Sequence, residues 1–160
     1  MTIRLSLPPM PDSEELDGSA PWWSDGLSFE CTGCGKCCLA REKYQYVYVN
    51  IHERRKLAGH LGLKLATFTR KYTELVDEGY RSLRFEDGAC VFLQDGLCRV
   101  HEAKPIQCGT WPFWEENLSS PQAWEDEVAS FSPGAGKGPL ISAEQIRIAI
   151  KKTDGAADLK

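Results

Sequence analysis

The stretch Phe29-Glu-Cys-Thr-Gly-Cys-Gly-Lys-Cys-Cys38 holds four of the seven cysteines in the chain. The thiols stand at Cys31, Cys34, Cys37 and Cys38. Two-residue spacers let successive thiolates converge on one metal ion or one cluster face, because the chain can wrap with its sulfurs inward. Gly33 and Gly35 permit the tight turns at positive φ that this wrapping needs. The stretch therefore predicts a domain organised around a metal centre.

The high cysteine count has two explanations, a disulfide framework or metal ligation. Residues 1–20 hold three prolines and an acidic run in place of the apolar core of a secretory signal. No apolar stretch reaches the ~20 residues that span a bilayer. We therefore expect a cytoplasmic protein with reduced thiols and no membrane partner. The odd number of cysteines also argues against complete internal pairing, so metal ligation is the favoured interpretation.

The bulk composition indicates a small globular protein. The 160 residues suffice for one domain with tails, and an apolar fraction of 42% does not fit a disordered chain. The formal net charge is −4, so no basic excess points to a nucleic-acid partner. We expect a flexible arm over residues 1–26, one domain over residues 27–152 and a tail over residues 153–160. Trp22 and Trp23 are the exception within the arm and are expected to pack on the domain.

A second group of candidate ligands lies further along the domain. It consists of Cys90, Cys98, His101 and Cys108. The segment Cys98-Arg-Val-His101 repeats the two-residue spacer with a histidine as its second donor. Seven cysteines plus His101 give eight candidate ligands, enough for two tetrahedral zinc sites, whereas one 4Fe–4S cluster needs four. Since neighbouring side chains diverge, we expect Cys37 and Cys38 to differ in role, one of them serving a second site or packing as an apolar residue.

The rest of the sequence predicts an α+β fold, a small domain whose short strands and several helices surround the cysteines. Strands are predicted over residues 44–49, 81–85 and 89–93, with turns at 86–88 and 95–96 and loops over 94–113 and 132–139. Such a fold can bring both cysteine groups together, and a bound metal would then tie the two halves of the domain.

Three helices are predicted from their start and stop signals. The first follows Asn50, where Glu53 completes a capping box, and it ends at Gly62. The second covers residues 65–72. The last starts at Ser142, with Gln145 as its capping partner.

Four cysteine elements follow one another in a fixed order, together with aromatic, glycine and proline residues. The set comprises Phe29, Cys31, Cys34, Gly35, Cys37 and Cys38, then Cys90, Phe92 and Leu93, then Gly96 and Cys98, then Lys104, Pro105, Cys108, Trp111 and Pro112. This set resembles the CxxCxxCC family of cysteine-cluster proteins, also called YkgJ-type, over roughly residues 27–150. Members commonly carry a cysteine where this chain has Ser132, which is a poor replacement for a soft thiolate.

The resemblance implies a domain that chelates zinc or iron, with the iron held as an iron–sulfur cluster such as 4Fe–4S. The ligands would come from the seven cysteines, and His101 is a further candidate. Wider relatives include flagellin lysine N-methylases, so one alternative is a protein-lysine N-methyltransferase that acts on a protein substrate. A third hypothesis is an interaction module that holds a purely structural zinc and binds a protein partner.

Overall fold

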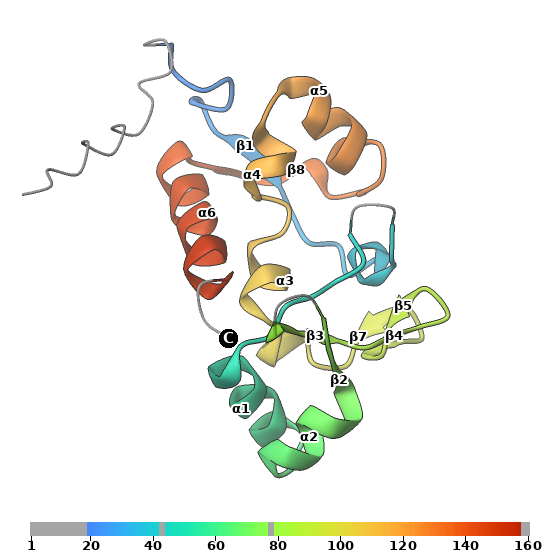
Figure 1. Cartoon of the computed structure of the whole chain (residues 1–160). Coiled ribbons are helices and arrows are strands. Elements are labelled where there is room, and N and C mark those ends of the chain that lie inside the picture. Colours follow the sequence, from blue (N-terminus) through green and yellow to red (C-terminus); the bar gives the residue numbers. More distant parts are fainter. Residues whose placement is uncertain (1–18, 42–43, 77–78, 158–160) are drawn as a thin grey trace, which may run out of the picture.

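The computed structural model describes residues 19–41, 44–76 and 79–157, and every structural statement below concerns these residues. The strands are β1 (Leu27–Phe29), β2 (Thr73–Leu75), β3 (Arg81–Leu83), β4 (Phe85–Glu86), β5 (Ala89–Cys90), β6 (Leu93–Gln94), β7 (Leu97–Cys98) and β8 (Ala135–Ile141). They form antiparallel pairs, β1 with β8, β2 with β3, β4 with β5 and β6 with β7. Helices accompany these pairs along the chain, which confirms the predicted α+β fold (Figure 1).

The helices divide between the two ends of the molecule. They are α1 (Ile51–His60), α2 (Leu65–Tyr72), α3 (Ile106–Thr110), α4 (Glu115–Leu118), α5 (Pro121–Trp124) and α6 (Ala143–Ala157), with the 3-10 turns η1 (Lys36–Cys38) and η3 (His101–Ala103) and the π-helical segment η4 (Glu125–Ala129). Figure 1 shows α1, α2 and the β2–β3 hairpin at one end, and β1, β8, α4, α5 and α6 at the other. The short helix α3 lies between the two ends.

The capping box of α1 also anchors α3. Asn50 Oδ1 accepts hydrogen bonds from the backbone N–H groups of His52 and Glu53, and Glu53 Oε2 accepts one from the N–H of Asn50 at 2.9 Å. The predicted box is therefore confirmed. The second carboxylate oxygen, Glu53 Oε1, accepts a hydrogen bond from the N–H of Ile106 at 2.8 Å, at the start of α3. One buried carboxylate thus satisfies orphan donors at the beginnings of two helices.

The strand predicted over residues 44–49 is wrong. This segment makes only isolated bridges, among them one between Tyr48 and Ser82. On its other side, the amide of Gln107 takes the place of a neighbouring strand, because it accepts from the N–H of Tyr48 at 2.9 Å and donates to the carbonyl of Tyr46 at 3.0 Å. A side chain from α3 therefore satisfies backbone groups that a ladder would otherwise pair.

The two strands predicted over residues 81–85 and 89–93 are each split in the structure. Residues 81–85 form β3 and the start of β4, and residues 89–93 form β5 and the start of β6. The predicted turns are confirmed, since Asp87-Gly88 connects β4 to β5 and Asp95-Gly96 connects β6 to β7. Asp87 and Asp95 both have φ of 50°, a left-handed conformation that aspartate tolerates in turns.

Both predicted loops contain regular structure. Residues 94–113 include β7, η3 and α3, and residues 132–139 include most of β8, which pairs with β1. The glycines of β8 let its backbone pass close to its neighbour, because a Cβ on Gly138 would lie 2.5 Å from the Cβ of Glu30. In the sequence, the same glycines suggest a loop. The pairing partner of β8 lies about a hundred residues earlier, so local composition could not reveal it.

Two hydrophobic clusters form the core. The first contains Val47, Val49, Leu57, Ala58, Phe68, Leu83, Cys90, Phe92, Val100 and Ala103. The second contains Trp23, Phe113, Leu118, Trp124, Val128 and Ile146, with Trp22 packed against it. The predicted packing of Trp22 and Trp23 is therefore confirmed, and the indole N–H of Trp22 donates to the carbonyl of Leu118 at 2.8 Å.

The last helix, α6, starts as predicted. The hydroxyl of Ser142 accepts from the N–H of Gln145 at 3.2 Å, and the Gln145 side chain accepts from the N–H of Ser142 at 2.9 Å. The helix continues to Ala157, past Thr153, whose hydroxyl lies 2.6 Å from that of Thr110 in α3. Within the described ranges, no helix is long and apolar enough to cross a membrane.

Candidate metal centre

All seven cysteines line one cavity of about 330 Å³, and His101 lines it with them. Its apolar wall comes from both core clusters and their neighbours, namely Phe29, Val47, Leu83, Phe92, Leu97, Val100, Trp111 and Phe131. The cavity therefore lies where the two ends of the molecule meet. Residues far apart in the sequence converge here, since Cys31 and Cys108 both line the cavity.

The first cysteine group lies on the segment that leads from β1 into η1. Cys31, Cys34 and Cys37 are exposed, whereas Cys38 is half-buried. Gly35 precedes η1 with φ of 71°, and a Cβ at this position would lie 2.6 Å from the carbonyl oxygen of Gly96. A glycine is thus required where the first cysteine group contacts the turn between β6 and β7.

The second cysteine group is held by two hairpins and a helix. Cys90 pairs with Phe85 in the β4–β5 hairpin, and Cys98 pairs with Leu93 in the β6–β7 hairpin. Cys90 is buried, with 7% of its surface exposed, and Cys108 lies on α3. His101, in η3, is exposed, and its Nε2 lies 3.5 Å from Lys104 Nζ.

Hydrogen bonds between thiols differentiate the cysteines electrostatically. Cys38 donates to Cys37 and to Cys98, which lowers the pKa of Cys37 to about 7 and that of Cys98 to about 6. Because a thiol carries one proton, Cys38 donates to only one of the two at a time. The same hydrogen bonds raise the pKa of Cys38 itself.

Burial acts in the opposite sense on the two deepest thiols. It raises the pKa of Cys90 to about 11, and it raises the pKa of Cys108, where the negative charge of neighbouring thiolates adds to the effect. These two groups stay neutral at pH 7 until a cation compensates for their desolvation. Lys36 and Lys104 also line the cavity and bring positive charge to it.

The donor chemistry of the cavity fits zinc or an iron–sulfur cluster. Thiolates are the soft ligands that both centres prefer, and apolar side chains line the cavity beside them. As the side chains lie, no three His, Cys, Asp or Glu residues of the described part form a group compact enough to hold one ion. The exposed thiols of Cys31, Cys34 and Cys37 can change rotamer without disturbing the core.

Three residues that are not cysteines also line or adjoin the cavity. Ser132, which stands where related chains are expected to have a cysteine, is buried and lines the same cavity. Arg41 supports the aromatic wall, because its guanidinium lies 3.7 Å from the ring centre of Phe131 and 5.5 Å from that of Trp111. Lys104 could have been found from its place in the Lys104-Pro105 element, whereas nothing local indicated Arg41.

Two uncharacterized proteins of Methanocaldococcus jannaschii are similar to this chain. MJ0939 is 30% identical over 93 residues, which cover 55% of this chain and 30% of that protein. MJ0661 is 24% identical over 91 residues, which cover 56% of this chain and 47% of that protein. The chain thus spans less than half the length of each of these relatives. No solved structure matches the chain.

The sequence model of the CxxCxxCC family, described as "Putative zinc- or iron-chelating domain", matches residues 30–129. This range is more than half of the chain and includes all seven cysteines and His101. Ser132 lies just beyond it. The resemblance seen in the motifs is therefore confirmed, and the chain belongs to the CxxCxxCC family of zinc- or iron-chelating domains.

Proposed function

We propose that this protein binds iron, as an iron–sulfur cluster, or zinc through thiolates that line the cavity between its two core clusters. The observation that carries the proposal is the convergence of seven thiols from four separate sequence elements on one cavity. All seven cysteines are free thiols in the structure. A reducing compartment such as the cytoplasm fits this state, and that location is part of the proposal.

Different cysteines would make different contributions to the bound metal. The lowered pKa values of Cys37 and Cys98 favour thiolates that are ready to bind a cation near neutral pH. Cys90 and Cys108 would lose their protons on metal binding, and Lys36 and Lys104 would offset part of the accumulated negative charge. Cys31 and Cys34 would close the site from the solvent side.

The number of thiols exceeds what a single centre requires. Four ligands complete a tetrahedral zinc site or hold one 4Fe–4S cluster. With seven cysteines and His101, the remaining donors would hydrogen-bond the ligands or hold a second ion. A bound iron–sulfur cluster would supply electron-transfer chemistry, whereas zinc would supply Lewis acidity or structural support.

Metal analysis of anaerobically purified protein tests the proposal. An iron–sulfur protein should be brown, with broad visible absorbance and matching iron and acid-labile sulfide contents. A zinc protein should be colourless with stoichiometric zinc. Protein that carries neither metal, and that takes up neither zinc nor a reconstituted cluster under reducing conditions, would overturn the proposal.

The methyltransferase and interaction-module hypotheses stay predictions, because neither the family description nor the names of the relatives bear on them. A titration of the metal-loaded protein with S-adenosylmethionine separates the first from a binding role alone. Saturable binding would favour transfer chemistry, and its absence would count against it. His101 stays a candidate ligand, because it lines the cavity and its Nε2 contacts only Lys104 among the hydrogen-bond partners described.

A further inference from the structure

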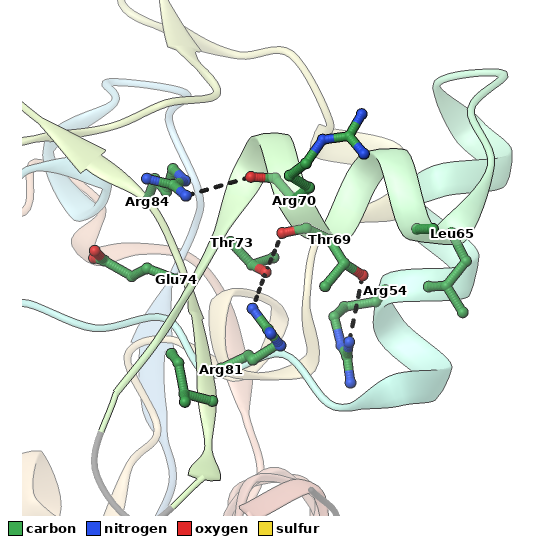
Figure 2. A pocket seen from close by; sticks show the side chains of 10 residues that line it. Arg54, Leu65, Thr69, Arg70, Thr73, Glu74, Arg81 and Arg84 are labelled. Carbon is green, nitrogen blue, oxygen red and sulfur yellow. Dashed lines mark hydrogen bonds between the residues drawn. The ribbon is translucent and has the colours of Figure 1, made fainter.

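A second pocket is lined by residues that include none of the cysteines. It occupies about 650 Å³ between α1, α2 and the β2–β3 hairpin (Figure 2). Four arginines line it, Arg54, Arg70, Arg81 and Arg84, and we call it the arginine pocket. It shares no described lining residue with the cysteine cavity, so its function can be tested independently of the metal.

The positive charge of the arginine pocket is not compensated within the described part of the chain. Glu74 is the only carboxylate among the described residues that line it, and none of the four arginines has a described carboxylate oxygen within 4.0 Å. Arg54 and Arg81 instead donate to the hydroxyls of Thr69 and Thr73, each at 3.3 Å. These are neutral acceptors at long distances in a chain whose net charge is negative.

Two of the guanidinium groups also contain buried donors without acceptors. Arg54 Nε and Arg84 Nε are both buried, and neither has a hydrogen-bond partner. An unpaired buried donor of a charged group costs free energy, so the described protein groups leave both guanidinium groups incompletely satisfied. Burial lowers the pKa of Arg54, and the positive charges of Arg81 and Arg55 lower it further. Among the described residues, none supplies a carboxylate that pairs with the four arginines.

We propose that the arginine pocket binds the phosphate group of a small-molecule ligand. Guanidinium forks match the oxygens of phosphate, and a phosphate monoester brings three acceptors and about −1.5 to −2 charges, more than a carboxylate can. Leu65, Ala66 and Leu75 give the pocket an apolar side against which the rest of the ligand would pack. The volume lies within the range of small-molecule sites, about 300–1,000 Å³.

Isothermal titration of the full chain with inorganic phosphate, AMP and adenosine tests this proposal at low ionic strength. Phosphate and AMP should bind in a one-to-one ratio, and adenosine, which lacks the phosphate, should not. Arg54→Gln and Arg70→Gln should each weaken AMP binding by about tenfold or more, as expected for loss of a charged hydrogen bond. Arg70 is exposed, so that variant keeps its fold whatever Arg54→Gln does.

The matched control is Arg99→Gln, since Arg99 is an exposed arginine that does not line the pocket. Its affinity for AMP should stay within twofold of the unmodified protein, and the metal content should be the same in all variants. Absence of binding at millimolar phosphate, or an equal loss in Arg99→Gln, would overturn the proposal. Stronger binding of a thymidine oligonucleotide than of AMP would assign the surface to nucleic acid and would also overturn it.

Discussion

Single thiols in the cysteine cavity have unlike surroundings, although the sequence presents them as a repeated motif. Cys38 donates its one hydrogen bond to Cys37 or to Cys98, whereas burial keeps Cys90 and Cys108 protonated. Cys34 is exposed and lies at the middle of the first spacer pair. A thiol in this position contributes little to core packing, so its removal tests metal binding with small effect on the apolar core.

Cys34→Ser should lose metal. Mutation of a residue that only hydrogen-bonds a metal ligand weakens metal affinity about 10–100-fold. Loss of a direct ligand should therefore weaken metal affinity by at least about 100-fold. The measurement is the metal-to-protein ratio after dialysis against a competing chelator. Thr32→Ala is the matched control, because Thr32 lines the same cavity and carries no soft donor. An unchanged ratio in Cys34→Ser would remove Cys34 from the ligand set.

Ser132→Cys should make the metal harder to remove. Ser132 is buried at 8% exposure and lines the cavity, so a thiol there would face the same space as the other seven. Sulfur is a far better ligand than a hydroxyl for zinc or iron–sulfur centres, and cysteine fits small buried positions. We expect metal loss to a chelator to slow by about tenfold, on the scale of changes near a metal site.

The control for this substitution is Ser130→Cys, which adds a thiol at an exposed position outside the cavity. Its rate of metal loss should match that of the unmodified protein. Equal rates in all three proteins would mean that the position of Ser132 does not reach the metal.

At the scale of elements, Gly35 holds the first cysteine segment against the β6–β7 turn. Gly35 and Gly33 both have positive φ, 71° and 66°, so alanine costs about 1–2 kcal/mol at either. Only at Gly35 would the new Cβ meet neighbours, 2.6 Å from the Gly96 oxygen and 2.9 Å from Leu93 Cδ1. Gly35→Ala should therefore lose about 1–3 kcal/mol more stability than Gly33→Ala, measured by urea denaturation.

Metal affinity shows whether the Gly35 contact also supports the site, in addition to the stability of the fold. If the Gly35 contact aligns the two cysteine groups, Gly35→Ala should also bind metal more weakly than Gly33→Ala does. The same metal affinity in both variants would show that the contact supports the fold and not the site.

Elements set by local interactions were predictable, and those set by distant ones were not. The capping boxes at Asn50 and Ser142 involve residues three apart, so the sequence displays them directly. The second partner of Glu53 lies 53 residues away at Ile106, and no local pattern indicates it. The β1–β8 pair was missed for the same reason, and glycines that permit its close contact resembled those of a loop.

The candidate site was more predictable than the fold around it. Cysteine spacing depends on ligand chemistry, so the motif identified all seven thiols that line the cavity without knowledge of the strands. Arg41 supports the aromatic wall of the cavity through tertiary contacts that cysteine spacing does not encode. The arginine pocket was not anticipated either, because its four arginines come from different elements and follow no motif.

For the whole molecule, a metal bound in the cavity would link the two ends. Val47, Leu83 and Phe92 of the first core cluster line it, as do Phe29 and Trp111, which pack against the second. Each cluster is small, and a domain of this size depends on every additional source of stability. A metal held by cysteines from both groups would therefore stabilise both ends at once.

Removal of the metal should lower the melting temperature and loosen both ends. A ligand present at about a thousand times its Kd adds about 4 kcal/mol to a folded protein, which corresponds to roughly 10 °C for a domain of this size. Calorimetry with and without a chelator measures this shift. Hydrogen exchange should show faster exchange in α1 and in α6 alike, because α1 lies at one end of the molecule and α6 at the other (Figure 1).

The Cys34→Ser variant gives this experiment its control. If the chelator acts only by taking the metal, it should shift the melting temperature of the unmodified protein and leave that of Cys34→Ser unchanged. Faster exchange confined to one end would mean that the metal stabilises that end alone and does not link it to the other.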